Sequence, residues 1–358
     1  MKRTLPISLL IVVLLAGAYL LFWPVPITPE AWTPPAAPTL VGPYTANAIL
    51  HELERLGESP NFAPEDIAVN AEGRAFGGYE SGRIIRWNPR GMNAELQVNT
   101  GGRPLGLDFD AQGNLIIADA YKGLLSLAPD KTLTTLADSC DGLKFGFTDD
   151  VEVAPDGSIY FSDASWKFDV RHYMDDLLEH RGNGRLLRHE PTTRKTEVLL
   201  DGLYFANGVA VAPDEQYVLV VETGKYRVMR HWLSGERAGQ TEVFIENLPG
   251  FPDGISRGTG GLFWLALASP RDATLDRLLP HPFLRKVIRR LPRSLQPGIQ
   301  RYSFVLGLDG DGKVVHNLQD PGAEYAPITS VQEADGFLYF GSIAEAAYGR
   351  FPRPQDPR

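Results

Sequence analysis

Six copies of a short two-strand unit, many turn-forming residues and an apolar N-terminal segment predict the fold class of this chain. Glycine and proline account for 36 and 28 of the 358 residues, and 43% of the residues are hydrophobic. This glycine and proline content exceeds that of an average globular protein and is typical of a fold with many turns. We predict an all-β protein, a six-bladed β-propeller with helical lid insertions, preceded by one N-terminal transmembrane helix.

Residues 1–23 are expected to form a cytoplasmic tip and a transmembrane signal anchor. Leu5–Trp23 has no charged residue and follows Lys2 and Arg3; as a helix it would extend roughly 28 Å, close to the ~30 Å of a bilayer core. The positive-inside rule leaves the N-terminus cytoplasmic and places the propeller on the outer side, periplasmic or extracellular/lumenal. A cleaved signal peptide is the alternative, because Ala16-Gly17-Ala18 resembles a cleavage site. The apolar run continues past this site, which favours an uncleaved anchor.

Residues 24–43 contain seven prolines, a composition typical of a semi-rigid extended spacer. We expect this spacer to hold the following domain away from the membrane. Residues 44–358 are then one closed propeller, since six blades form a single unit. The segment Ala46–Leu56 is expected to add an outer strand to the last blade and so close the ring.

The repeated unit contains a polar residue, a short apolar strand, a turn that ends in glycine, and a second strand. Strand-like alternation at this period is typical of propeller blades; a β-sandwich of many short strands is the alternative. The six copies of the first strand are Pro64–Val69, Pro104–Phe109, Thr148–Val153, Ala206–Val211, Pro252–Ile255 and, with a slip in register, Ile328–Val331.

Two blades are longer than a blade requires. Equivalent positions recur after 40 to 46 residues in three cases, but after 58 and 76 residues in the other two, whereas a bare blade needs ~40–45. Insertions therefore lie at about 164–182 and 269–301, and both contain helical patterns, at Asp169–His180 and Pro282–Leu291. Both follow second strands, so they should form a lid over one end of the propeller.

Oxygen-bearing side chains recur at the second position of the unit. Equivalent positions of a propeller converge on the central axis, where carboxylates would repel one another unless a cation lay between them. An all-oxygen set without histidine or cysteine selects a hard ion, for which Ca²⁺ fits better than Zn²⁺. Single acids at such positions often only cap turns, but four of the six positions carry candidate ligands: Glu65, Asp149, Asn207 and Asp253.

Further acids should surround the same mouth of the channel. Asp119, Asp163 and Glu222 follow second strands, which return to the ligand end, and Asp150 is adjacent to Asp149. We assign these four to the second shell or the mouth.

Several segments carry a resemblance to a known family. Gly202–Val209, Leu219–Thr223, Gly250–Gly254 and Val331–Ser342 resemble the strictosidine-synthase-like branch of the calcium-dependent six-bladed propellers. These also include SMP-30/gluconolactonase-like proteins, diisopropyl-fluorophosphatase-type esterases and paraoxonases. The chain is most similar to the adipocyte plasma membrane-associated protein group, which has the same kind of N-terminal anchor. The resemblance spans Ala46–Ser342.

The resemblance implies metal ligation by Glu65, Asn207 and Asp253, whereas Asp149 stands where relatives usually have asparagine. Thr329 occupies the place of the acid/base glutamate of plant strictosidine synthases, which argues against a condensing enzyme. We expect a membrane-anchored, calcium-dependent hydrolase of lactones or esters, in which Asp253 or Asp149 acts as nucleophile or activates water. A propeller that only binds a partner, with structural calcium, is the alternative.

The expected substrate is a lipophilic small molecule. A net charge of −9 argues against nucleic acid as a partner, and the single cysteine excludes an internal disulfide. The second insertion predicts a basic amphipathic helix with Phe283 on its apolar face. The opposite face would carry Arg285, Lys286, Arg289 and Arg290. We expect this lid to face the membrane; alternatively, its apolar face packs on the propeller.

Overall fold

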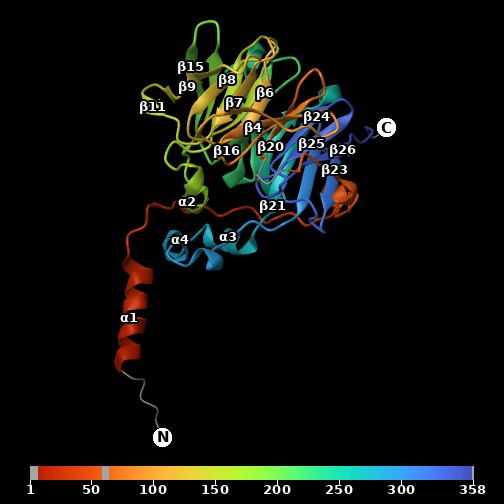
Figure 1. The fold of residues 1–358 in the computed structure, drawn as a ribbon. Coiled ribbons are helices and arrows are strands. Elements are labelled where there is room, and N and C mark those ends of the chain that lie inside the picture. The colour runs from red at the N-terminus through yellow and green to blue at the C-terminus, as the bar shows by residue number, and fades with distance from the viewer. Residues whose placement is uncertain (1–6, 59–63, 357–358) are drawn as a thin grey trace.

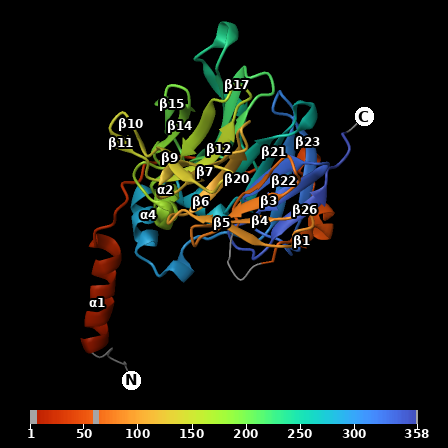
Figure 2. The same cartoon turned by 45° about the horizontal axis from the view of Figure 1, so that its top comes forward.

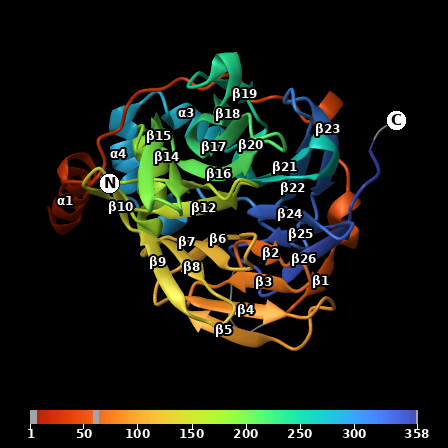
Figure 3. The same ribbon diagram turned by 90° about the horizontal axis from the view of Figure 1, so that it is seen from above.

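A computed structural model describes residues 7–58 and 64–356 of the chain. Six four-stranded antiparallel sheets surround a common axis (Figure 3), which confirms the predicted all-β, six-bladed propeller. In each of the first five blades, four consecutive strands run from the axis outward.

The first three blades follow one another directly in the chain. The first holds β2 (Ile67–Val69), β3 (Ala75–Gly78), β4 (Arg83–Trp87) and β5 (Glu95–Asn99). The second holds β6 (Pro104–Phe109), β7 (Leu115–Asp119), β8 (Gly123–Leu127) and β9 (Leu133–Ala137). After a small hairpin of β10 (Ser139–Cys140) and β11 (Leu143–Lys144), the third holds β12 (Thr148–Val153), β13 (Ile159–Asp163), β14 (Gly184–Glu190) and β15 (Lys195–Leu203).

The remaining blades complete the ring. The fourth holds β16 (Ala206–Val211), β17 (Tyr217–Glu222), β18 (Arg227–Trp232) and β19 (Thr241–Ile245). The fifth holds β20 (Gly250–Arg257), β21 (Phe263–Pro270), β22 (Ser303–Leu308) and β23 (Val314–Asp320). The sixth holds β24 (Ser330–Ala334), β25 (Phe337–Gly341), β26 (Tyr348–Pro352) and β1 (Glu54–Leu56). Because β1 pairs with β26 in antiparallel register, the N-terminal part of the domain closes the ring as predicted.

The core lies between neighbouring blades rather than at one centre. Ile116 and Ala118 of the second blade, for example, pack with Val151 and Phe161 of the third in one buried cluster. Each sheet therefore buries both faces, which is why strands such as β7 and β13 are buried along their whole length.

The innermost strands share an irregularity near the axis. In β6, β12, β16 and β20 the pairing with the second strand shifts register at the second and third positions of the repeat unit. Such bulges redirect side chains out of regular alternation and are common beside functional sites.

Helices of the two insertions cover one end of the propeller (Figure 1). α2 (Tyr173–Glu179) follows β13, while α3 (Ala273–Leu278) and α4 (Pro282–Arg289) follow β21. Both helical predictions are thus confirmed.

The N-terminal segment consists of one helix followed by an extended stretch. α1 (Ile7–Phe22) extends away from the propeller beside α4 (Figure 2). None of the helices within 7–58 and 64–356 is long and apolar enough to cross a membrane. Lys2 and Arg3, on which the predicted orientation depends, lie outside the described residues.

Residues 24–43 contact the lid, and their role as a spacer between domain and membrane stays a prediction. Ile27 is 1% exposed, the Glu30 amide donates to the Glu179 carbonyl at 3.0 Å, and the Trp32 amide donates to the Leu279 carbonyl at 3.2 Å. The prolines keep this strap extended, and its apolar side chains give it a surface to bury. We call residues 24–43 the strap.

Candidate metal and substrate site under the lid

The four predicted ligands line one cavity of about 160 Å³ at the lid end of the channel. Asp149, Asn207 and Asp253 lie at the register shifts of β12, β16 and β20, and Glu65 immediately precedes the first blade. The bulge turns each second-position side chain toward the mouth while the rest of the strand keeps its pairing.

Close backbone packing brings these strands together. A Cβ added to Gly208 would lie 2.3 Å from the Ile255 nitrogen, and one added to Gly254 would lie 2.7 Å from the Thr329 carbonyl oxygen. Glycine is therefore required at these two third positions. The Thr329 hydroxyl donates to the Glu65 backbone carbonyl at 2.9 Å, so the sixth blade positions a ligand candidate without supplying one to the cavity.

The carboxylates at this end repel one another. Burial, followed by repulsion from Glu65 and Asp253, raises the pKa of Asp149 well above its usual range. Burial and the Glu65 charge do the same to the pKa of Asp253, which the Asn207 amide partly offsets by hydrogen bonding. The pKa of Glu65 is raised to about 7 by burial, against a lowering effect of Arg103. A cation in this cavity would relieve all three effects.

The donor set fits a hard cation. Three carboxylates and one amide supply only oxygen atoms of the type that Ca²⁺ prefers, and Asp149 Oδ2 is buried without a hydrogen-bond partner. Among the residues that the structure describes, no group of three or more His, Cys, Asp or Glu side chains has an arrangement that could hold a metal as it stands. The residues therefore fit calcium by donor chemistry and by the unpartnered oxygen.

The walls of the cavity are mainly apolar and come from both insertions. Met174 and Leu177 of α2, Leu275 of α3 and Ile299 from the segment after α4 enclose it. The insertions thus cover the four ligand candidates, as the sequence predicted for a lid.

One ring of cavity residues was missed in the sequence. The residue immediately before the repeat unit is an arginine in the second blade and a phenylalanine in the next three, and all four side chains line the cavity: Arg103, Phe147, Phe205 and Phe251. Their recurrence at one position of the repeat was the available signal.

Comparisons with known proteins agree with this architecture. The strictosidine synthase family model matches residues 149–236, and the strictosidine synthase-like N-terminal model matches residues 42–87. Adipocyte plasma membrane-associated protein of Bos taurus is 36% identical over 89% of this chain and 82% of its own length. Strictosidine synthase-like protein 7 of Arabidopsis thaliana is 36% identical over 96% of this chain and 94% of its own. The chain belongs to the strictosidine synthase-like family.

The chain is also similar in fold to solved structures of more distantly related propellers. A gluconolactonase of Xanthomonas campestris gives a TM-score of 0.62 at 18% identity, covering 84% of this chain and 89% of its own. Regucalcin of Agrobacterium tumefaciens, titled a calcium-binding protein, gives 0.60 at 16% identity, covering 85% and 95%. At these identities the likeness shows the fold alone.

Three acids that we assigned to the second shell or the mouth bind backbone amides behind the cavity. Asp119 accepts from the Arg103 amide at 3.0 Å, Asp163 from the Phe147 amide at 2.9 Å, and Glu222 from the Tyr204 amide at 2.9 Å. Each acid ends the second strand of its blade and fixes the loop that enters the first strand. They hold the cavity residues in place from behind, and none of them lines the cavity.

Asp150, which we assigned to the second shell or the mouth, lines a second cavity of about 60 Å³ on the channel, together with Asp66, Asp108 and Arg257. Asp150 Oδ1 accepts from the Val151 amide at 2.9 Å and Oδ2 from the Val209 amide at 2.8 Å. The residue therefore joins the third and fourth blades.

Two arginines of the predicted basic face of α4 bind groups within the protein. Arg285 is fully buried, donates to the Leu178 carbonyl at 2.8 Å and contacts the Glu30 carbonyl. Arg289 pairs with Asp175 of α2. These contacts overturn the expectation that Arg285 faces a membrane, because unpaired carbonyls at the end of α2 and in the strap recruit its guanidinium.

Proposed function

We propose that this protein is a membrane-attached, calcium-dependent hydrolase of lactones or esters. The observation that carries the proposal is Asp149 Oδ2, buried and without a hydrogen-bond partner, in a cavity that it shares with two more carboxylates and an amide. A buried unpartnered carboxylate oxygen costs free energy of folding, and such groups cluster where function requires them.

Each polar group of the cavity would have a separate role in hydrolysis. Bound calcium would supply Lewis-acid polarisation of a carbonyl or phosphoryl oxygen. Asp253, oriented by the Asn207 amide, is placed to attack as nucleophile, or Asp149 to take a proton from water through its free Oδ2. Arg103 lines the same cavity and would stabilise negative charge that develops on the substrate.

The cavity wall favours a lipophilic substrate. Phe147, Phe205 and Phe251 face the cavity from three successive blades, and apolar lid residues enclose the other side. A pocket of this kind, with few polar groups at one end, orients an apolar ligand by its single polar function.

Attachment to a membrane would be through α1. Its outer side chains are apolar and exposed, with Leu14 at 62% and Leu15 at 66%. A relative that shares 36% identity is named for its association with the plasma membrane. We infer that α1 inserts into a bilayer and that the propeller lies on the outer side.

Hydrolysis of phenyl acetate and a panel of lactones by the full-length protein in detergent, with and without chelator, tests the proposal. We expect turnover that chelation abolishes and calcium restores. No turnover of any substrate by protein that binds calcium would favour the non-catalytic alternative, a propeller that binds a partner. Turnover that is insensitive to chelation would contradict the calcium role.

A further inference from the structure

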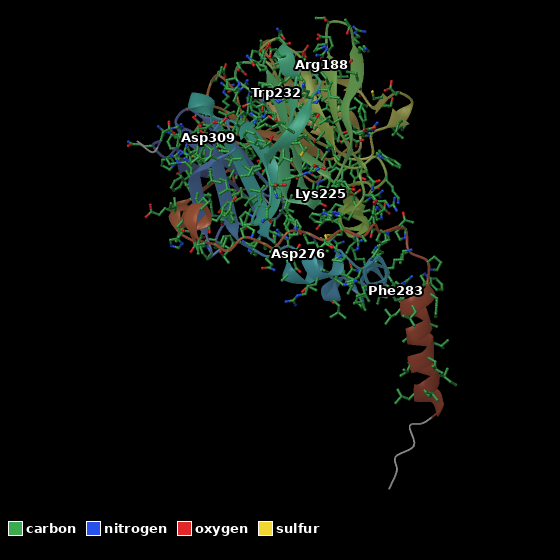
Figure 4. The ribbon with its side chains drawn as sticks, turned by 180° about the vertical axis from the view of Figure 1, so that it is seen from behind. Arg188, Lys225, Trp232, Asp276, Phe283 and Asp309 are labelled. Carbon is green, nitrogen blue, oxygen red and sulfur yellow. The ribbon has the colours of Figure 1, made fainter. Side chains whose placement is uncertain are left out.

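The outer surface of the lid is apolar at the place where α1 leaves the domain. Phe283 and Leu284 of α4 are 55% and 44% exposed, and Leu295 and Ile299 of the following segment are 64% and 40% exposed. Figure 4 shows Phe283 on the side of the domain from which α1 projects, whereas Trp232 and Asp309 lie on distant parts of the propeller. We call these four residues the lid patch.

α1 is held directly against this part of the lid. Arg290, at the end of α4, donates to the Leu20 carbonyl at 2.8 Å and to the Trp23 carbonyl at 2.6 Å. These are carbonyls at the C-terminal end of α1, where helices leave such groups unpaired. Trp23, beside these carbonyls, is 61% exposed. Because the end of α1 lies against α4, a bilayer into which α1 inserts would reach α4.

The charges of the second insertion sort into two groups. Within 271–301, five cations contact carboxylates or carbonyls of the protein: Arg271, Arg285, Arg289, Arg290 and Arg301. The other three have no ion-pair partner in the described part of the chain: Arg277, Lys286 and Arg293. Unpaired cations flanking exposed apolar side chains match the headgroups and acyl boundary of an anionic bilayer.

The lid patch and the cavity lie on opposite sides of one chain segment. Pro297, Gly298 and Ile299 line it from inside, and Ile299 also belongs to the exposed patch. The segment between α4 and β22 therefore separates the cavity from the outer apolar surface by the thickness of one chain.

We propose that the lid patch lies in the interface of an anionic phospholipid bilayer, so that the cavity opens toward the lipid and takes its ligand from there. The proposal rests on the membrane attachment of α1 proposed above and is independent of hydrolysis. It keeps the sequence-based expectation that Phe283 faces the membrane and departs from it at Arg285 and Arg290, which tie the helix to the rest of the protein.

The test places one environment-sensitive fluorophore at a time on the full-length chain, with Cys140, the only cysteine, replaced by serine. Phe283→Cys reports on the lid and Leu14→Cys on α1. Met92→Cys, in the turn between β4 and β5, is the matched control because Met92 is 52% exposed. The protein is reconstituted into vesicles of phosphatidylcholine with a minority of phosphatidylglycerol.

Lipids carrying a nitroxide near the headgroup should quench the label at position 283 several-fold more than the label at 92, and iodide should show the reverse order. Leu284→Asp should lower lipid quenching of a second label at Ile299→Cys, whereas Leu96→Asp, on β5, should leave it unchanged. Equal lipid quenching at 283 and 92 would overturn the proposal, even where Leu14 is quenched and α1 is inserted. Protection of 283 from iodide without lipid quenching would also overturn it and indicate a second protein copy on the patch.

Discussion

Acidic side chains gather in two cavities on the channel, and the two groups differ in what they bind. In the cavity under the lid, Asp149 Oδ2 has no hydrogen-bond partner. Burial raises the pKa values of Glu65, Asp149 and Asp253, and repulsion from the Glu65 charge adds to the rise for Asp149 and Asp253. In the second cavity, Asp66 and Asp108 each accept backbone amides through both carboxylate oxygens.

The second group joins blades. Asp66 accepts from the Leu107 amide of the next blade at 2.9 Å, Asp108 from the Val153 amide at 2.7 Å, and Asp150 from the Val209 amide at 2.8 Å. Glu152 faces Arg257 across the channel at 3.3 Å. Charge-assisted bonds of this kind satisfy amide groups that the bulges leave out of the sheet.

The comparison separates function from structure among chemically identical residues. Asp149 and Asp150 are neighbours in the chain, yet the bulge in β12 sends them to opposite groups. The partners of a buried acid, together with its position within the repeat, therefore indicate which acid is available for chemistry.

The sharpest test of this separation substitutes Asp149 and Asp150 one at a time and compares the variants. Asp149→Asn and Asp253→Asn should each lower kcat by at least about 10²-fold, because an amide oxygen can still coordinate but cannot act as base or nucleophile. Asp150→Asn should retain kcat. Turnover of phenyl acetate measures the effect, and matched circular dichroism spectra control for folding. A loss of kcat in Asp150→Asn equal to that in Asp149→Asn would break the distinction.

Removal of calcium should affect only the cavity under the lid. A ligand bound to the native state alone stabilises it by about 2.7 kcal/mol at one hundred times its dissociation constant. We expect exhaustive chelation to lower the thermal midpoint of the parent protein and of Asp150→Asn by similar amounts. Asp149→Ala, which lacks the ligand oxygens, should show a much smaller shift. Identical midpoints for the parent with and without calcium would contradict the metal site.

Much of this architecture could be predicted from the sequence, because equivalent positions of a repeated unit occupy equivalent places in the folded ring. The second position of each unit indicated which side chains converge, since equivalent points of a closed ring face one axis. The closing strand β1 and the lid helices followed from interval lengths and periodicity in the same way. The phenylalanines before the unit were equally predictable, because they recur at Phe147, Phe205 and Phe251.

The directions in which side chains point, and the groups that they bind, could not be predicted in this way. Period-two alternation places Asp149 and Asp150 on opposite faces only within a regular strand, and the register shift that decides their fate depends on the neighbouring blade. The burial of Arg285 depends on the Leu178 and Glu30 carbonyls, more than 100 residues away in sequence. Such long-range satisfaction of backbone groups leaves no local pattern.

Stability should respond most to the second group of acids. Asp150→Ala removes the acceptor of two buried amides, and leaving buried donors unsatisfied costs on the order of 1–3 kcal/mol. We expect a loss of about 2 kcal/mol in denaturant unfolding, with calcium affinity unchanged. Asp130→Ala, an exposed aspartate that accepts one amide at 2.9 Å, should stay within about 0.5 kcal/mol. Weaker calcium binding in Asp150→Ala would show that the two groups are coupled.

A further expected effect is a pH dependence of stability that calcium removes only in part. Burial raises the pKa of Glu65 to about 7 under the lid, and it raises the pKa of Glu152 to about 8 and of Asp108 to about 6 in the second group. The native state therefore holds more protons than the unfolded chain between about pH 4 and pH 8, and stability falls as pH rises through this window, by at most ~1.4 kcal/mol per pH unit for each proton. Bound calcium would keep Glu65 ionised and so cancel the contribution of Glu65 to the slope. Glu152→Gln should cancel a contribution that calcium does not affect. Unfolding measured at several pH values, with and without calcium, gives both slopes. If calcium abolishes the slope of unfolding free energy against pH completely, the ion also determines the protonation of Glu152 and Asp108. That result would contradict the distinction between the two groups.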